Sequence, residues 1–177
     1  MGRFFCWFML IGFAQILATT QITFRDASAK EVLELQEHVI SFYGKELLKA
    51  GLFQEATLAY NAAKDEIAQD SADITFYNIT DNTGVMRYGY ISYSINNQKA
   101  YLETIYLDEQ YRGCGLGKAA LSSLELKLKE AGIMLIRLYV FAHNKAAINL
   151  YTKQGYTIEN TYFNKADLVG YHMQKAL

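Results

Sequence analysis

The chain has 177 residues, a length that favours one domain, and its 51% hydrophobic and 14% aromatic residues can bury a sizeable core. A net charge of -1, with no strong charge block, gives no electrostatic case for nucleic-acid binding. The two cysteines, Cys6 and Cys114, are far apart, and with three scattered histidines they show no metal-ligand spacing. We therefore expect neither a disulfide framework nor a bound metal.

Residues 4–18 are almost wholly apolar and follow a single Arg3. This is the layout of a secretory signal peptide, although Ile16 stands where a small residue is expected before cleavage. A signal anchor, or an extension ahead of a cytoplasmic domain, fits the same composition. We separate residues 1–20 as a leader from one domain over residues 21–177, and expect membrane association only through residues 4–18.

Two helices are predicted in the first part of the domain. Ser28 and Glu31 have the spacing of a capping box, and the apolar residues that follow recur every three or four positions. We expect Gly44 to interrupt this helix. A second helix over residues 46–69 should bend at Gly51.

Alternating polarity and turn residues predict four strands, over residues 21–25, 73–78, 85–94 and 101–107. Asn96 and Asn97 both tolerate positive φ, which predicts a tight turn before the last of these strands. In that strand Glu103 shares a face with Tyr101, Ile105 and Leu107, an apolar setting that would suit a carboxylate used as a base.

Gly113, Gly115 and Gly117 follow this strand directly, and a helical pattern begins near Leu116. Glycines let the backbone bend sharply and a ligand approach its N–H groups, which at a helix start are unpaired and favour an anion. The arrangement predicts a phosphate-binding loop. Its spacing is one residue short of a nucleotide P-loop, with Ala119 in place of the Mg²⁺-binding hydroxyl, and it does not match the dinucleotide pattern G-x-G-x-x-G.

The amphipathic helix after the loop ends at Gly132, and the apolar run over residues 133–142 predicts a buried strand. A strand, a helix and a strand in this order form a βαβ crossover. Asn144 then caps a short helix that stops at Gly155. The remaining residues predict a closing antiparallel pair of strands.

Two stretches carry a family resemblance. Residues 110–115, Gln-Tyr-Arg-Gly-Cys-Gly, fit the pattern Q/R-x-x-G-x-G/A and resemble the loop with which GCN5-related N-acetyltransferases (the GNAT superfamily) bind the pyrophosphate of acetyl-CoA. Residues 144–151, followed by Gly155 and Tyr156, resemble the second acetyl-CoA motif of that superfamily. The resemblance implies an α/β (α+β) fold: a mixed, mostly antiparallel twisted sheet of about six or seven strands, with a central βαβ crossover and about four helices.

The resemblance further implies an acetyl-CoA-dependent N-acetyltransferase that acetylates a primary amine by direct attack and needs no metal. Tyr151 would give a proton to the CoA sulfur, and the base would be Glu103 or ordered water. The residues expected to bind acetyl-CoA are Ile105, Tyr106, Leu107, Arg112, Gly113, Cys114, Gly115, Leu116, Gly117, Lys118 and Asn144.

Each role has a structural alternative. Tyr151 also fits a core aromatic, Asn144 a plain helix cap, and Glu103 a paired strand carboxylate. At the level of function the alternative is a non-catalytic acyl-CoA-binding or regulatory module on the same fold.

The acceptor is expected to be a small-molecule or peptide amine. The residues expected around it are Phe42, Tyr43, Phe53, Tyr162 and Phe163. Because acetyl-CoA is a cytosolic metabolite, we expect a cytoplasmic domain, with export or anchoring through the leader as the alternative. The identity of the amine and the oligomeric state stay open.

Overall fold

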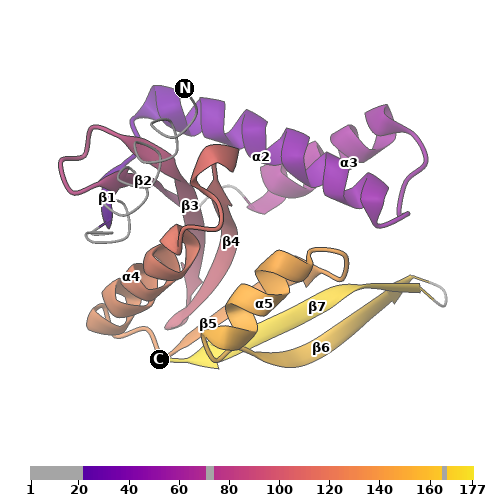
Figure 1. The fold of residues 1–177 in the computed structure, drawn as a ribbon. Coiled ribbons are helices and arrows are strands. Elements are labelled where there is room, and N and C mark those ends of the chain that lie inside the picture. Colours follow the sequence, from indigo (N-terminus) through magenta and orange to yellow (C-terminus); the bar gives the residue numbers. More distant parts are fainter. Residues whose placement is uncertain (1–21, 71–73, 165–166) are drawn as a thin grey trace, which may run out of the picture.

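One seven-stranded sheet, with the order β1-β2-β3-β4-β5-β7-β6, runs through the part of the chain that the computed structural model describes, residues 22–70, 74–164 and 167–177 (Figure 1). The apolar leader lies outside these residues. The strands are β1 (Ile22–Asp26), β2 (Thr75–Asp81), β3 (Arg87–Asn96), β4 (Lys99–Leu107), β5 (Leu135–Phe141), β6 (Thr157–Asn164) and β7 (Asp167–Ala176). β4 and β5 are parallel and the other neighbours are antiparallel, which confirms the predicted mixed sheet.

Helices cover both faces of the sheet (Figure 1). The α-helices are α2 (Ala29–Lys49), α3 (Ala56–Asp70), α4 (Leu116–Glu130) and α5 (Lys145–Lys153). α4 and α5 bury Leu121, Leu124 and Tyr151 against one face, whereas α2 and α3 bury Leu35, Ile40 and other residues against the opposite face. Among the residues described, no helix is both long and apolar enough to span a membrane.

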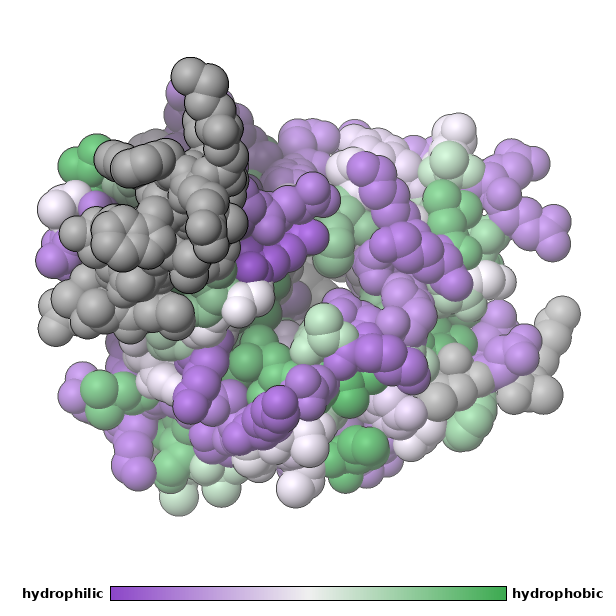
Figure 2. Space-filling view, in the orientation of Figure 1, coloured by the Kyte–Doolittle hydropathy of each residue, from purple (hydrophilic) through white to green (hydrophobic). Residues whose placement is uncertain are grey.

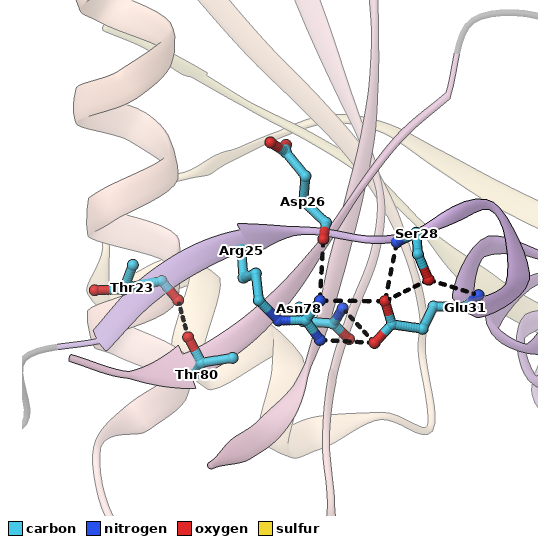
Figure 3. A network of polar contacts seen from close by, with 7 residues as sticks. All are labelled: Thr23, Arg25, Asp26, Ser28, Glu31, Asn78 and Thr80. Carbon is cyan, nitrogen blue, oxygen red and sulfur yellow. Dashed lines mark hydrogen bonds and ion pairs between the residues drawn. The ribbon is translucent and has the colours of Figure 1, made fainter. Parts of the chain in front are cut away.

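The start of α2 is held by a polar network around Glu31 (Figure 3). The Ser28 and Glu31 side chains each accept a hydrogen bond from the other residue's backbone N–H, so the predicted capping box is confirmed. Arg25 Nη2 contacts Glu31 Oε1 at 2.6 Å, and Asn78 Nδ2 of β2 donates to the same oxygen at 3.3 Å. The Arg25 guanidinium, together with Ser28, lowers the pKa of Glu31 to about 2.

Gly44 does not interrupt α2, so the prediction of a break there is wrong. The helix runs through Gly44 and ends at Lys49, followed by Gly51 with a φ of 71°. A Cβ at Gly44 would lie 3.2 Å from Cα of Tyr60 in α3. The glycine therefore lets the two helices approach closely, and this packing outweighs its low helix propensity.

The tight turn between β3 and β4 is confirmed, but it lies one residue later than predicted. The residues with positive φ are Asn97 and Gln98, at 49° and 62°. The hydrogen-bonded pairing of Asn96 with Lys99 sets this position, because it leaves two residues for the turn.

We expect Glu31→Ala to lower the free energy of unfolding at pH 7 by about 1–3 kcal/mol, because it leaves the fully buried Asn78 amide without a partner. The loss should shrink as the pH falls from about 4.5 towards 2, since the carboxylate contributes only while it is ionised in the folded chain. Thermal unfolding across this pH range measures both effects.

The matched control is Glu34→Ala, which removes an exposed carboxylate of the same helix that lies 3.8 Å from Lys30. It should change stability by less than about 1 kcal/mol. Equal losses in the two variants at pH 7 would contradict the role of the Glu31 network.

Candidate active site

The sheet opens between β4 and β5. These strands pair only over residues 99–102 and 135–138, although β3 holds β4 as far as Leu107 and β7 holds β5 as far as Phe141. Beyond the paired part, the peptide groups that β4 and β5 direct toward each other have no strand partner. Such groups need donors and acceptors from elsewhere, and two of the predicted pantetheine-binding residues, Ile105 and Leu107, are among them. The peptide groups of Tyr106 face β3 instead.

A β-bulge in β4 lies where the opening begins. In the pairing with β3, Ser92 lies opposite Thr104 whereas Tyr93 lies opposite Leu102. Glu103 is therefore the extra residue on β4, and the strand bends at this point.

The bulge changes which side chains share a face. Leu102 before it and both Ile105 and Leu107 after it pack into the same core under α4. The prediction that Glu103 lies with Ile105 and Leu107 is therefore wrong, because one extra residue shifts the alternation by one. Glu103 lies on the side opposite that core, where Ser94 Oγ donates to its Oε1 at 2.7 Å.

The glycine loop connects the end of β4 to the first turn of α4. Gly113 and Gly115 have φ values of 76° and 84°, a left-handed conformation that side chains rarely adopt. Gly115 is the residue before α4, and the N–H groups of the first helical turn have no acceptor within the helix. The loop therefore presents several backbone donors at a helix N-terminus, which fits the pyrophosphate of acetyl-CoA.

Arg112 is anchored at the end of β4. Its Nε donates to the carbonyl oxygen of Leu107 at 2.8 Å, and its guanidinium carbon lies 5.3 Å from the ring centroid of Tyr106. This position gives the loop a fixed positive charge. Lys118, in the first turn of α4, is exposed and lines the same cleft as Arg112.

Helix α5 begins where β5 ends. Asn144 caps it, as predicted: its Oδ1 accepts from the N–H of Ala147 at 3.1 Å. Tyr151 is the buried residue of this helix, 6% exposed, and its ring lies 5.6 Å from that of Tyr156. Burial raises the pKa of the Tyr151 hydroxyl above its ordinary value, so the hydroxyl stays protonated at neutral and moderately alkaline pH.

The opening, the loop and α5 line one cleft with a volume of about 1830 Å³. Figure 2 shows this side of the molecule hollowed near its centre, between the part that carries α2 and α3 and the part that carries α5. The predicted residues that line the cleft are Glu103, Ile105, Tyr106, Leu107, Arg112, Gly113, Gly115, Gly117, Lys118, Asn144 and Tyr151. Cys114 and Leu116 do not line it; Cys114 Sγ contacts Arg112 O at 3.5 Å, and Leu116 is 2% exposed.

The far end of the cleft is rich in aromatic side chains. Of the five aromatic residues predicted near the acceptor, Phe42, Tyr43, Phe53 and Tyr162 line it, whereas Phe163 is 55% exposed and does not. Phe163 follows Tyr162 in β6, so alternation along the strand directs it to the other face.

Sequence reasoning missed two cleft residues, Glu46 of α2 and His143 before α5. His143 Nε2 lies 2.6 Å from Glu46 Oε2, although the two residues are 97 positions apart. No local pattern connects them; an acidic residue on an otherwise buried helix face was the available signal. Among the residues described, no group of three or more His, Cys, Asp or Glu side chains is arranged to hold a metal ion.

Comparison with known proteins gives matching relatives. YdgE of Bacillus subtilis, an uncharacterized N-acetyltransferase, is 37% identical over 101 residues, which are 55% of this chain and 64% of YdgE. The spermidine N(1)-acetyltransferase of Thermoplasma acidophilum is 34% identical over 95 residues, which are 53% of this chain and 57% of that enzyme. The chain thus matches less than two thirds of the length of either relative.

Solved structures share the fold. YycN of Bacillus subtilis superposes with a TM-score of 0.72 at 24% identity, covering 82% of this chain and 98% of YycN. The PaiA N-acetyltransferase of Thermoplasma acidophilum, solved in complex with coenzyme A, gives a TM-score of 0.64 at 22% identity and covers 89% and 100% of the two chains. The acetyltransferase (GNAT) family matches residues 32–156, most of the sequence, and the chain therefore belongs to this family.

Proposed function

We propose that the chain transfers an acetyl group from acetyl-CoA to a primary amine by direct attack of the amine nitrogen. The opening between β4 and β5 carries the proposal, because it joins unpaired strand peptides, a helix N-terminus and Tyr151 in one cleft. In this arrangement residues 105–107 would bind the pantetheine arm. The N–H groups of residues 113–118, with Arg112 and Lys118, would bind the pyrophosphate.

Tyr151 is proposed as the proton donor. As the amine attacks, a C–N bond forms and the C–S bond breaks, which leaves a thiolate that needs a proton. The hydroxyl stays protonated because burial raises its pKa, and both Tyr151 and Asn144 line the cleft. The base predicted from the sequence is Glu103 or ordered water, and Glu103 Oε1 accepts from Ser94.

The acceptor end favours a cationic amine. Three carboxylates line the cleft, Glu46, Glu66 and Glu103, together with aromatic rings from several elements. Glu46 is paired with Lys49, so Glu66 and Glu103 are the two proposed to attract the amine. Tyr43 Oη lies 3.1 Å from both oxygens of Glu66, which places a ring and a carboxylate side by side. Carboxylates and aromatic faces both attract ammonium groups. Because a relative is a spermidine N(1)-acetyltransferase, we propose a polyamine-like acceptor.

Gly115→Val should weaken coenzyme A binding by about tenfold or more, which corresponds to about 1.4 kcal/mol. A Cβ at Gly115 meets nothing within 4 Å, so the effect comes from the left-handed φ rather than from a clash. Calorimetric titration with coenzyme A measures the affinity.

Gly132→Val is the matched control, because Gly132 has a φ of 79° and equally open space but lies after the far end of α4. It should strain the chain similarly and leave the affinity unchanged. Equal affinities in the wild type and Gly115→Val would remove the loop from the binding site.

Tyr151→Phe should lower kcat by about 100-fold or more, the usual contribution of a general acid, and leave coenzyme A affinity unchanged. The ring that packs in the core is kept, so only the hydroxyl is lost. Tyr156→Phe is the control, since Tyr156 is 3% exposed, adjacent to Tyr151, and does not line the cleft. If the two variants have the same kcat as the wild type, Tyr151 is a core residue only.

A panel of amines assayed for release of coenzyme A tests the function as a whole. We expect turnover with the polycation spermidine to exceed turnover with a neutral amino acid or a peptide N-terminus, because of the carboxylates in the cleft. An aminoglycoside, which is also a polycation, tests whether positive charge alone is sufficient. Preference for another amine would overturn the polyamine proposal. If no amine in the panel causes release of coenzyme A although the chain still binds coenzyme A, the result would favour the non-catalytic acyl-CoA-binding module.

A further inference from the structure

Glu46 is the one charged side chain that is buried among the residues described, with 4% of its surface exposed. Both of its carboxylate oxygens are engaged. Lys49 Nζ contacts Oε1 at 2.7 Å, and His143 Nε2 contacts Oε2 at 2.6 Å. A buried carboxylate persists where such partners compensate its lost hydration.

The contact with Glu46 determines which nitrogen of His143 carries a proton. An ionised carboxylate only accepts hydrogen bonds, so Nε2 must be the N–H that donates to Glu46. In the neutral imidazole, Nδ1 then carries the lone pair. Within the described part of the chain, Glu46 is the hydrogen-bond partner of the His143 ring.

The ring of His143 is also fixed in orientation. It stacks on Phe141 with the centroids 5.4 Å apart and the planes inclined by 21°. His143 lies between the end of β5 and the Asn144 cap of α5, and it lines the same cleft as Tyr151 and Glu103. Its side chain is 32% exposed, so it is reachable from the cleft.

We propose that His143, positioned by Glu46, accepts the proton that the acceptor amine must lose before it attacks acetyl-CoA. This inference rests on the proposed function. A base whose second nitrogen is held by a carboxylate is a recurrent arrangement in nucleophilic catalysis, because the carboxylate fixes the tautomer and stabilises the imidazolium that forms.

The acceptor amine loses two protons in the reaction. The acceptor enters as an ammonium ion, and His143 Nδ1 takes one proton from it and later passes that proton to solvent. The amine nitrogen then forms the C–N bond while the C–S bond breaks. Tyr151 gives its proton to the thiolate, and the second proton that the nitrogen loses passes through solvent to the Tyr151 oxygen, which restores the hydroxyl.

Glu103 is the competing group. Its carboxylate already accepts from Ser94 and lies at the bulge of β4. We assign Glu103 to attraction of the cationic amine rather than to proton transfer. The other titratable side chains on the elements packed around this pair that line the cleft are Tyr43, Lys49, Glu66, Tyr101, Tyr139, Tyr162 and His172.

The test uses the full chain with acetyl-CoA and spermidine as probes, and measures kcat/KM between about pH 5.5 and 9. His143→Gln should lower kcat/KM by about 100-fold and abolish the rise of activity with pH. Imidazole added to His143→Gly should restore part of the activity. Glu46→Gln should lower kcat/KM and move the rise to lower pH, because the imidazolium loses its carboxylate partner.

His38→Gln is the matched control, because His38 also packs against aromatic rings but does not line the cleft. It should keep the wild-type kcat/KM and pH profile. Coenzyme A affinity and thermal unfolding show whether each variant is folded. If His143→Gln does not fold, the pH dependence of kcat/KM in Glu46→Gln tests the proposal instead.

If the wild type is active and His143→Gln has the same kcat/KM and pH profile, the role proposed for His143 is wrong but the proposed function is not affected. Loss of the pH-dependent rise in Glu103→Gln, with His143→Gln unaffected, would assign the base to Glu103. A wild type that releases no coenzyme A with any amine would overturn the proposed function and this inference together.

Discussion

The incomplete pairing of β4 and β5 is the constraint on which the candidate site depends. Each strand keeps its outer neighbour, so the sheet stays continuous while its centre opens. Both strands run in the same direction, and therefore α4 and α5, which follow them, begin near the same end of the opening. The unpaired peptides would be costly if nothing bound them. In the proposed function a ligand arm with amide groups would satisfy them, and the helix N-termini would supply the positive ends of two dipoles.

The bulge at Glu103 divides β4 into a part that packs within the sheet and a part that borders the cleft. Before it, β4 alternates as part of a sheet that is covered on both faces. After it, Ile105 and Leu107 take over the contacts with the core under α4, and Glu103 lies on the other side. One extra residue thus keeps the core intact while it places a carboxylate in the cleft.

Features with local causes could be predicted from the sequence. The capping box at Ser28 and the cap at Asn144 depend on groups three residues away, and the structure contains both. Gly44 shows the opposite case, because its reason lies in Tyr60 of another helix and the expected break does not occur. The contact between Glu46 and His143 also depends on the packing of distant elements, so no periodicity or motif could indicate it.

The burial of Asn78 has a consequence for covalent modification. Asn78, Ile79 and Thr80 form the acceptor pattern for N-linked glycosylation. Asn78 has no exposed surface in the middle of β2, and its amide nitrogen donates to Glu31. A glycan on that nitrogen would displace the carboxylate that caps α2. The described fold and a sugar at this asparagine therefore exclude each other.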